Sequence, residues 1–377
     1  MRREKVEGRG SKVEGIKARR LVPLLLDWFS VNARDLAWRR TRDPYAIWVS
    51  EIMLQQTQVK TVIPYYDRWM RELPTIEALA NASSGKIHKL WEGLGYYTRV
   101  RNMQRAAQTI VAEHAGGFPT TFDEVLALPG IGRYTAGAIC SIAFNQPTPI
   151  LDGNVIRVLT RVFGIRENAR EKPINAKLWE LARKLVTTAA GSSIAGSPSA
   201  MGNCSALNQS LMELGALICT PRAPKCGQCP LCKLCVARRE DCVEQLPNLG
   251  ERAMATARRF VAVLVQRNGQ VLIRQRPEGI VNAHLWEFPN VEVPLRAAAI
   301  QVRNALAEEL GCAIETLTPL GTIRHTITRY RISLEVFRVN LNGKSPRPAC
   351  GMWKTSCEMD ALPLTSAHGR IARKWIG

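Results

Sequence analysis

The stretch FDEVLALPGIGRYTAGAICSIAF (122–144) predicts two helices joined by a tight turn. The first helix should end at Leu128, and the second should start near Tyr134. The glycines of the turn let backbone N–H groups approach a phosphate, which the N-terminal dipole of the second helix also favours. This helix–hairpin–helix pattern predicts a grip on a nucleic-acid backbone that does not read sequence, with an ordinary helical turn as the alternative. The candidate DNA-binding residues of the turn are Gly130 and Gly132.

The charge balance favours a polyanionic partner. The 377 residues include 52 Lys and Arg against 32 Asp and Glu, which gives a formal net charge of +20 at pH 7. Phosphate contacts release counterions and supply affinity that does not depend on sequence, so nucleic acid is the natural partner. Solubility charge is the alternative. We see no apolar run of membrane-spanning length and no signal-peptide pattern, and we therefore expect a cytoplasmic protein.

Apolar spacing divides the chain into a long helical part and a later α+β part. The Lys- and Arg-rich start (1–20) predicts a disordered basic arm. Helical periodicity then runs from Leu21 to about Val236, and a small, polar stretch over 191–206 predicts a loop between helices. The residues 237–257 contain Pro and Gly and predict a linker.

The period changes after the linker. RFVAVLVQRNGQVLIRQR (259–276) predicts two β-strands around an Asn268-Gly269 turn. One helix at about 296–310 and a strand-like stretch over 322–339 follow. We therefore expect a separate α+β domain over 258–377.

The segment DPYAIWVSEIMLQQT (43–57) predicts a helix that carries a buried carboxylate. Asp43 is a good helix cap because a Pro follows it at the first helical position. Glu51 lies one turn after Ile47 and Trp48, so desolvation should raise the pKa of its carboxyl group. That state suits a general acid near neutral pH, whereas a solvated Glu is the alternative.

A second carboxylate opens the helix in PILDGNVIRVLTR (149–161). Asp152 precedes an apolar-periodic helix, and alone it would be a plain N-cap. Beside the sugar of a nucleotide, the same carboxylate can stabilise positive charge on the anomeric carbon. Asn154 and Arg157 follow it into the first turn. Together with Glu51 and the hairpin, Asp152 becomes a catalytic candidate.

The stretch CTPRAPKCGQCPLCKLC (219–235) holds five of the eleven cysteines. Four of them have the spacing C-x6-C-x2-C-x5-C, which can wrap one compact cluster, and [4Fe–4S] sites use four cysteine thiolates. The asymmetric spacing favours iron–sulfur over a structural zinc, which usually shows paired short knuckles and is the alternative. Cys232 lies inside the last interval, and its role is open. The expected ligands are Cys219, Cys226, Cys229 and Cys235.

With its hairpin, its two carboxylates and its cysteine spacing, the chain resembles the helix–hairpin–helix DNA glycosylases that carry an iron–sulfur loop. Within that group it most closely resembles the adenine DNA glycosylases of the MutY type. The most specific stretches are VSEIMLQQTQVKTVIPYY (49–66), WEGLGYYTRVRN (91–102) and ILDGNVIRVL (150–159). The resemblance implies a mainly α catalytic region, made of a six-helix barrel and an iron–sulfur cluster domain, followed by an α+β Nudix-like domain. The implied bounds are 21–43 with 151–236 for the cluster domain, 44–150 for the six-helix domain with the hairpin, and 258–377 for the Nudix-like lesion-recognition domain.

The resemblance also implies an activity. It predicts a DNA N-glycosylase of base excision repair that removes adenine mispaired with 8-oxoguanine or guanine in double-stranded DNA. Glu51 would protonate adenine at N7, and Asp152 would stabilise the oxocarbenium-like transition state with support from Asn154 and Tyr134. The base must leave the stack because its glycosidic bond is not accessible inside the duplex. We expect a [4Fe–4S] cofactor and a monomer of bacterial type that DNA binding holds at the nucleoid.

Further positions match binding residues of that family. Gln56 and Tyr96 match residues that wedge into the duplex, and Thr57 and Leu94 match contacts to the 8-oxoguanine side. The pocket for the extruded adenine is matched by Leu36, Trp38, Arg39 and Gln209. Bifunctional relatives of the endonuclease III type carry a Schiff-base lysine where this chain has Tyr134, so we expect no efficient strand cleavage.

The C-terminal domain departs from the glycosylase family pattern at one place and from the Nudix hydrolase pattern at another. Where a Phe-Ser-His loop usually reads 8-oxoguanine, this chain has Ile327-Thr328-Arg329, in which Thr328 keeps a hydroxyl and stays a candidate DNA contact. The stretch RNALAEELG (303–311) resembles the back half of a Nudix box, but Asn304 replaces its first Glu. Without the full set of carboxylates for magnesium, we do not expect hydrolysis of nucleoside triphosphates.

Three other hypotheses remain. The first is a sibling glycosylase of the same fold that removes thymine or a damaged pyrimidine. The second is a non-catalytic DNA-binding iron–sulfur protein, and the third is a Nudix-type pyrophosphohydrolase with a DNA-binding N-terminal part. A panel of mismatched duplexes tests the first. The presence of both Glu51 and Asp152 argues against the second, and the incomplete Nudix box argues against the third.

Overall fold

The computed structural model describes residues 2–192, 202–251, 254–327, 329–341 and 345–376, with side chains from Glu14 onward. By its internal contacts the chain divides into two compact units. The first comprises Met1–Ala80 and Met103–Arg252, and the second comprises Asn81–Asn102 and Ala253–Gly377. Among the described helices, none combines the length and the apolar character that crossing a bilayer requires.

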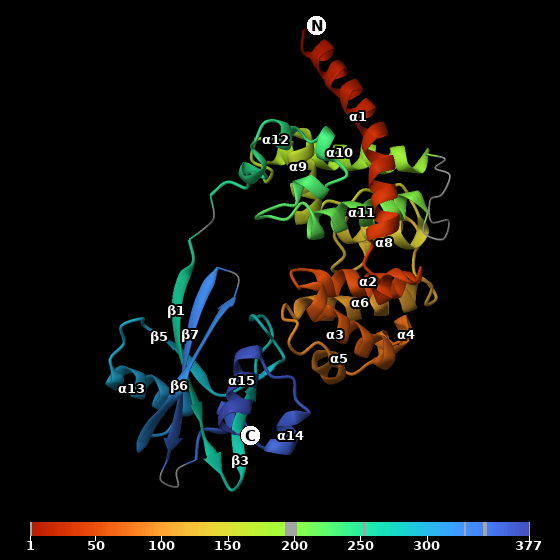
Figure 1. The fold of residues 1–377 in the computed structure, drawn as a ribbon. Helices are drawn as coiled ribbons and strands as arrows, with labels where there is room; N and C mark the ends of the chain where they lie inside the picture. The colour runs from red at the N-terminus through yellow and green to blue at the C-terminus, as the bar shows by residue number, and fades with distance from the viewer. Residues whose placement is uncertain (1, 193–201, 252–253, 328, 342–344, 377) are drawn as a thin grey trace. The chain divides into compact units, whose positions relative to one another are not determined.

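The first unit is helical, as the sequence predicts (Figure 1). Two of its helices, α4 and α6, extend across the division between the units. The helices are α1 (Arg2–Asn32), α2 (Pro44–Leu54), α3 (Val59–Glu72), α4 (Ile76–Asn81), α6 (Thr98–Glu113), α7 (Phe122–Ala127), α8 (Arg133–Phe144), α9 (Gly153–Phe163), α10 (Lys172–Ala190), α11 (Asn203–Leu217) and α12 (Val236–Arg239), with 3-10 turns η1 (Ala37–Arg39), η2 (Cys226–Gln228), η3 (Cys232–Leu234) and η4 (Val243–Gln245).

The helix–hairpin–helix prediction is confirmed by α7 and α8. The Ile131 amide donates to the Leu128 carbonyl at 3.1 Å, which closes the turn between the two helices. Gly130 has a φ of 76°, a backbone conformation that favours glycine. Gly132 caps α8, and no heavy atom would lie within 4 Å of a Cβ built there. The first amides of α8 are therefore approachable from the side of the turn.

The structure has a helix over most of the stretch 1–20 for which the sequence predicts a disordered arm, since α1 begins at Arg2. Where side chains are described, the reason is visible: Ala18, Leu21 and Val22 are buried at helical spacing. The Lys17 Nζ donates to the Val162 carbonyl at 2.6 Å, and α1 packs on α10 and α11. The basic residues before Leu21 therefore continue an amphipathic helix.

The predicted linker and loop are also shorter than expected. The start of 237–257 is folded as α12 and η4, because Ala237, Cys242 and Leu246 form a small buried cluster. Their irregular spacing gives no periodic signal, so the sequence pattern hides this contact. Residues 203–206 of the predicted loop belong to α11, and 193–201 lie outside the described residues.

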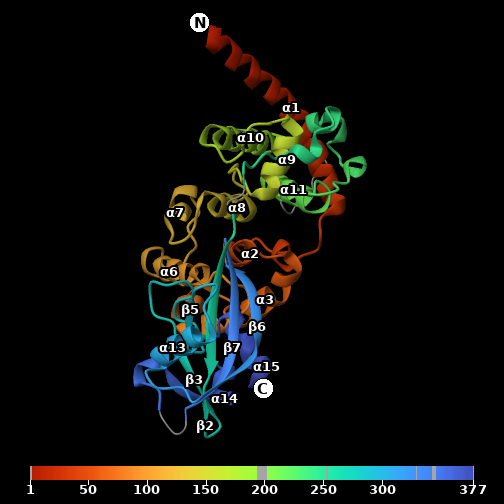
Figure 2. The ribbon, with the colours of Figure 1, turned by 90° about the vertical axis from the view of Figure 1, so that its left-hand side faces the viewer.

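The second unit combines α5 (Ser84–Leu90) with an α+β fold. Its main sheet has the order β5-β1-β7-β6, in which β1 and β7 are parallel and the other pairs antiparallel. Figures 1 and 2 show the long strands β1, β7 and β6 side by side. The elements are β1 (Thr256–Leu264), β2 (Gln266–Arg267), β3 (Gln270–Gln275), β4 (Trp286–Glu287), β5 (Asn290–Val293), α13 (Ala299–Leu310), β6 (Thr316–Ile327), β7 (Tyr330–Asn340), η5 (Pro348–Cys350), β8 (Met352–Thr355), α14 (Ser356–Asp360) and α15 (Ser366–Trp375).

The predicted turn at Asn268-Gly269 is confirmed, since Arg267 pairs with Gln270 across it. The stretch predicted as one strand over 322–339 instead holds parts of two, β6 and β7, which pair as a hairpin. Ile327 pairs with Tyr330, and the sequence between the two strands offers no Gly or Pro signal.

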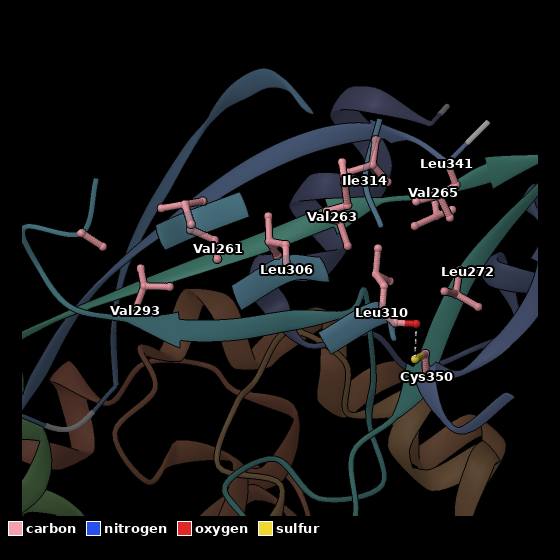
Figure 3. Close-up of a cluster of buried hydrophobic side chains, with 13 residues drawn as sticks. Val261, Val263, Val265, Leu272, Val293, Leu306, Leu310, Ile314, Leu341 and Cys350 are labelled. Atoms are coloured by element: carbon pink, nitrogen blue, oxygen red, sulfur yellow. Dashed lines mark hydrogen bonds between the residues drawn. The ribbon is translucent and has the colours of Figure 1, made fainter. Parts of the chain in front are cut away.

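Successive side chains of β1 point alternately into two buried clusters, as expected for a strand covered on both faces. Val261 and Val263 pack with Leu306 and Leu310 of α13, as Figure 3 shows. Ala262 and Leu264 point to the opposite face, where they pack with residues of α15.

The segment Asn81–Asn102 falls with the second unit, although the sequence predicts it inside a six-helix domain over 44–150. Three hydrogen bonds join this segment to the rest of the second unit. Arg101 Nη1 donates to the Ala283 carbonyl at 3.0 Å, Lys89 Nζ donates to the Leu362 carbonyl at 3.3 Å, and the Leu364 amide donates to Glu92 at 3.2 Å.

Candidate active site and cysteine cluster

Glu51 lies buried on α2, with 5% of its surface exposed. The Tyr134 hydroxyl donates to Glu51 Oε2 at 2.8 Å. Burial raises the pKa of the Glu51 carboxyl to about 7, and the charge of Asp152 adds to this, against the Tyr134 hydrogen bond and the charge of Arg39. A carboxyl group with such a pKa keeps a transferable proton near neutral pH, which is what the sequence predicts for Glu51.

Tyr134 stands in the first turn of α8, directly after the hairpin. Its hydroxyl also lies 3.2 Å from the Met212 sulfur. Burial raises the pKa of the Tyr134 hydroxyl well above its ordinary value, and the charges of Glu51 and Asp152 act in the same direction. Tyr134 is therefore a permanent donor that fixes the orientation of the Glu51 carboxyl.

Asp152 caps α9, as its position before the helix predicts. Its Oδ1 accepts from the Val155 amide at 2.7 Å, and its Oδ2 accepts from Asn154 Nδ2 at 2.8 Å. Burial raises the pKa of Asp152, while these hydrogen bonds and the Arg157 charge lower it. Because the charge of Asp152 raises the pKa of Glu51, the two carboxyl groups are electrostatically coupled.

Arg157 holds Asn154, the hydrogen-bond partner of Asp152, in place. Its Nη2 donates to Asn154 Oδ1 at 2.8 Å and to the Gly215 carbonyl at 2.7 Å, and its Nε donates to the Cys219 carbonyl at 2.6 Å. Gly215 lets α11 approach α9 closely, since a Cβ there would lie 2.6 Å from the Asn154 Cβ. The Asp152–Asn154 pair is thus held by packing as well as by hydrogen bonds.

The four residues predicted to line an adenine pocket come from two elements. Leu36 and Trp38 are buried at η1, where Trp38 packs edge-on against Tyr66 with ring centroids 5.2 Å apart. Arg39 ends η1, and Gln209 is buried on α11. Both elements belong to the first unit, and the Arg39 charge acts on Glu51.

Two of the predicted duplex contacts have strained backbones. Gln56 is exposed with a φ of 56°, and Tyr96 is 46% exposed with a φ of 49°. Non-glycine residues in this region are uncommon and gather at binding and catalytic sites. Thr57 is half-buried in the first unit, and Leu94 is buried in the second. The remaining predicted contact, Thr328, lies outside the described residues.

The four predicted cysteine ligands line one cavity, together with Cys232. The turns η2 and η3 fold the chain around it, and α9 supplies Arg161, whose Nη1 lies 3.3 Å from the Cys219 sulfur. Among the described residues, no group of three or more His, Cys, Asp or Glu converges as ligands of a single metal ion.

Two residues of the site escaped sequence reasoning, namely Met212 and Glu213. Met212 contacts the Tyr134 hydroxyl, and Glu213 binds Arg39. Both lie on α11 three and four residues after Gln209, which is one turn of a helix. That spacing is the signal that would have placed them beside the predicted pocket.

The first unit thus holds a hairpin that presents backbone amides, a coupled pair of buried carboxyl groups and a cysteine-lined cavity. Residues 49–184 match the model of the HhH-GPD superfamily base excision DNA repair protein, and 260–374 match that of the NUDIX domain.

Similar proteins narrow this class. The human adenine DNA glycosylase is 36% identical over 94% of this chain and 73% of its own length. That of Buchnera aphidicola subsp. Schizaphis graminum is 38% identical over 75% of this chain and 78% of its own. The structure of a thermostable thymine-DNA glycosylase is 31% identical with a TM-score of 0.52, over 59% of this chain and 97% of that one. This chain belongs to the MutY-type adenine DNA glycosylase family.

Proposed function

We propose that this chain excises adenine mispaired with 8-oxoguanine or guanine from duplex DNA, as a monofunctional N-glycosylase of base excision repair. The observation that carries the proposal is the buried Glu51, which accepts from Tyr134 and is electrostatically coupled to Asp152. A proton donor and a negative charge at one site are what departure of a protonated base from a sugar requires.

Glu51 is the acid in this mechanism. Because its pKa is raised to about 7, the carboxyl group keeps a proton to donate near neutral pH, and protonation of adenine at N7 makes the base a better leaving group. Tyr134 holds the carboxyl oriented while the proton moves. Because Tyr134 offers a hydroxyl and no amine, it forms no Schiff base, and the product keeps an intact strand.

Asp152 is the charge that stabilises the transition state. As the glycosidic bond breaks, positive charge develops on the sugar, and a carboxylate held by Val155 and Asn154 faces it without reorganisation. The same charge offsets the positive end of the α9 dipole, which would otherwise oppose a cation there. Water then adds to the sugar.

The duplex contacts follow from the same reasoning. The hairpin before α8 binds a backbone phosphate, and Gln56 and Tyr96 enter the stack as adenine turns into the pocket of Leu36, Trp38, Arg39 and Gln209. We assign recognition of the opposite base to Thr57, Leu94 and Thr328.

We assign a [4Fe–4S] cluster to Cys219, Cys226, Cys229 and Cys235. The fit rests on a cavity lined by these side chains, with a guanidinium from Arg161 that complements thiolate charge. The asymmetric spacing C-x6-C-x2-C-x5-C favours an iron–sulfur cluster over a structural zinc, which usually shows paired short knuckles. When bound, the cluster supplies a rigid cross-link of the 219–235 loop and takes part in no step of excision.

The Nudix-like domain is assigned to lesion recognition. Two of its carboxylates are paired with arginines: Arg274 pairs with Glu287 and Glu309, and Arg276 also pairs with Glu287. Internal cations at these positions disfavour the magnesium that phosphate hydrolysis needs.

Single-turnover excision on a panel of duplexes tests the proposal. Adenine is placed opposite 8-oxoguanine, guanine or cytosine, and thymine is placed opposite guanine. We expect fast adenine release opposite 8-oxoguanine, slower release opposite guanine and none opposite cytosine. Release of thymine without release of adenine would instead assign the chain to the sibling glycosylases.

A further inference from the structure

Glu213 is a buried carboxylate that binds two arginines at once. Only 1% of its surface is exposed. From Arg34 it accepts hydrogen bonds of 3.0 Å (backbone amide), 2.8 Å (Nε) and 2.6 Å (Nη2). From Arg39 it accepts two more, both of 3.0 Å. Although burial acts to raise the pKa of Glu213, the hydrogen bonds from both arginines outweigh it and lower the pKa to about 2.

These contacts join two parts of the site that are far apart in sequence. Arg39 Nη1 also donates to the Arg34 carbonyl at 3.1 Å, and its guanidinium lies 5.4 Å above the centre of the Phe29 ring. A hydrogen bond thus joins the two ends of the segment from Arg34 to Arg39, which carries Leu36 and Trp38. Both ends also bind Glu213 of α11. The same helix carries Gln209 on the preceding turn.

The same carboxylate shapes the electrostatics around Glu51. The positive charge of Arg39 favours the ionised form of Glu51, which has lost the proton that excision needs. Glu213 places a negative charge directly on Arg39, 3.0 Å from its Nη2. Opposite charges this close cancel much of each other's field at a third group. The negative charge of Glu213 therefore opposes the field that Arg39 exerts on Glu51.

We propose that Glu213 is a positioning residue for adenine excision: it fixes Arg39 and the Leu36–Trp38 wall of the pocket, and it offsets the Arg39 charge at Glu51. The inference rests on the proposed function, in which Glu51 is the acid. It predicts that loss of the Glu213 charge changes the pH dependence of excision, which a buried ion pair that only stabilises the fold would leave unchanged.

The test compares single-turnover rates per active site between pH 5.5 and 9 for Glu213→Gln and the wild type, on adenine opposite 8-oxoguanine. Active sites are titrated so that misfolded protein does not count. The excision rate should fall on the alkaline side of the pH profile, and we call this fall the alkaline limb. In Glu213→Gln we expect the alkaline limb to move to a pH lower by about 0.5 to 1 unit, because Arg39 without its counter-charge lowers the pKa of Glu51. At pH 8 the rate should then fall about threefold to tenfold, with a much smaller loss at pH 6.

Two further variants frame this result. Glu180→Gln removes an exposed ion pair with Arg183 on α10 and should leave the limb unmoved. Arg34→Met leaves the Glu213–Arg39 pair in place and removes one cation, so the limb should move upward, opposite to Glu213→Gln. Arg34→Met also keeps the proposal testable if Glu213→Gln does not fold.

Two results would overturn the proposal. One is a Glu213→Gln protein of lower thermal stability whose rate per active site and alkaline limb equal those of the wild type, which would make Glu213 a structural residue. The other, where only Arg34→Met folds, is an unmoved limb. Failure of the wild type to release adenine from any duplex is a separate outcome, because it refutes the proposed function itself.

Discussion

Replacing Asp152 with Asn separates catalysis from folding at one position. Asn is as good an N-cap as Asp, so its side-chain oxygen can still accept from the Val155 amide, now bonded at 2.7 Å. The second oxygen becomes an NH2 group, which cannot accept from Asn154, and the loss of that hydrogen bond costs about 1 kcal/mol of stability. The protein should therefore stay folded and bind DNA.

The effect on excision should be much larger. The lost charge faces the cation of the transition state, and removal of one preorganised electrostatic group from such a site slows reactions by about 10²- to 10³-fold, or roughly 3 to 4 kcal/mol. The Asp152 charge also raises the pKa of Glu51, so the variant should lose activity further at alkaline pH.

Single-turnover excision, a DNA-binding titration and thermal unfolding measure these three effects together. Asp43→Asn is the matched control, because Asp43 caps α2 by accepting from the Tyr45 amide at 3.0 Å and should leave the excision rate unchanged. An Asp152→Asn protein that excises adenine within about threefold of the wild-type rate would show that the Asp152 charge does not stabilise the transition state.

Three further predictions concern the acid, the cluster and the packing behind the site. Because only protonated Glu51 donates and its pKa is about 7, the wild-type excision rate should be highest below pH 7 and fall as the pH rises through 7; a rate that is constant from pH 6 to 9 contradicts this. Cys226→Ser should lose the brown iron–sulfur absorption or the folded protein, whereas Cys232→Ser should keep both, and visible spectra decide between these assignments. Gly215→Ala should destabilise the fold by about 1 to 3 kcal/mol and slow excision, since the new Cβ meets Asn154; denaturant unfolding and the excision rate measure this, and wild-type values for both would contradict it.

Local patterns made most of the fold predictable. The Gly turn before α8, the Asp43 and Asp152 caps and the Asn268-Gly269 turn all act through neighbouring residues, so their sequence signals survive in the structure. The burial of Glu51 was also readable, because it follows from apolar residues one turn away on the same helix.

Contacts between distant segments were not predictable in the same way. The folding of α12 depends on a few apolar residues at irregular spacing, and the helical start of α1 depends on packing against α10 and α11. Glu213 and Arg39 are 174 positions apart, and no local sequence pattern around either residue indicates that they pair. Single-sequence reasoning reached one partner, Arg39, through its family match, and missed the other.

The most direct test of the account compares the wild type with Glu51→Gln in single-turnover excision of adenine opposite 8-oxoguanine. Gln keeps the size of the side chain and can still accept from Tyr134, but it carries no acidic proton. We expect rapid adenine release by the wild type, loss of excision in Glu51→Gln and near-equal binding of the mismatched duplex by both. Adenine release by Glu51→Gln at the wild-type rate would contradict the central claim that this carboxyl group is the acid.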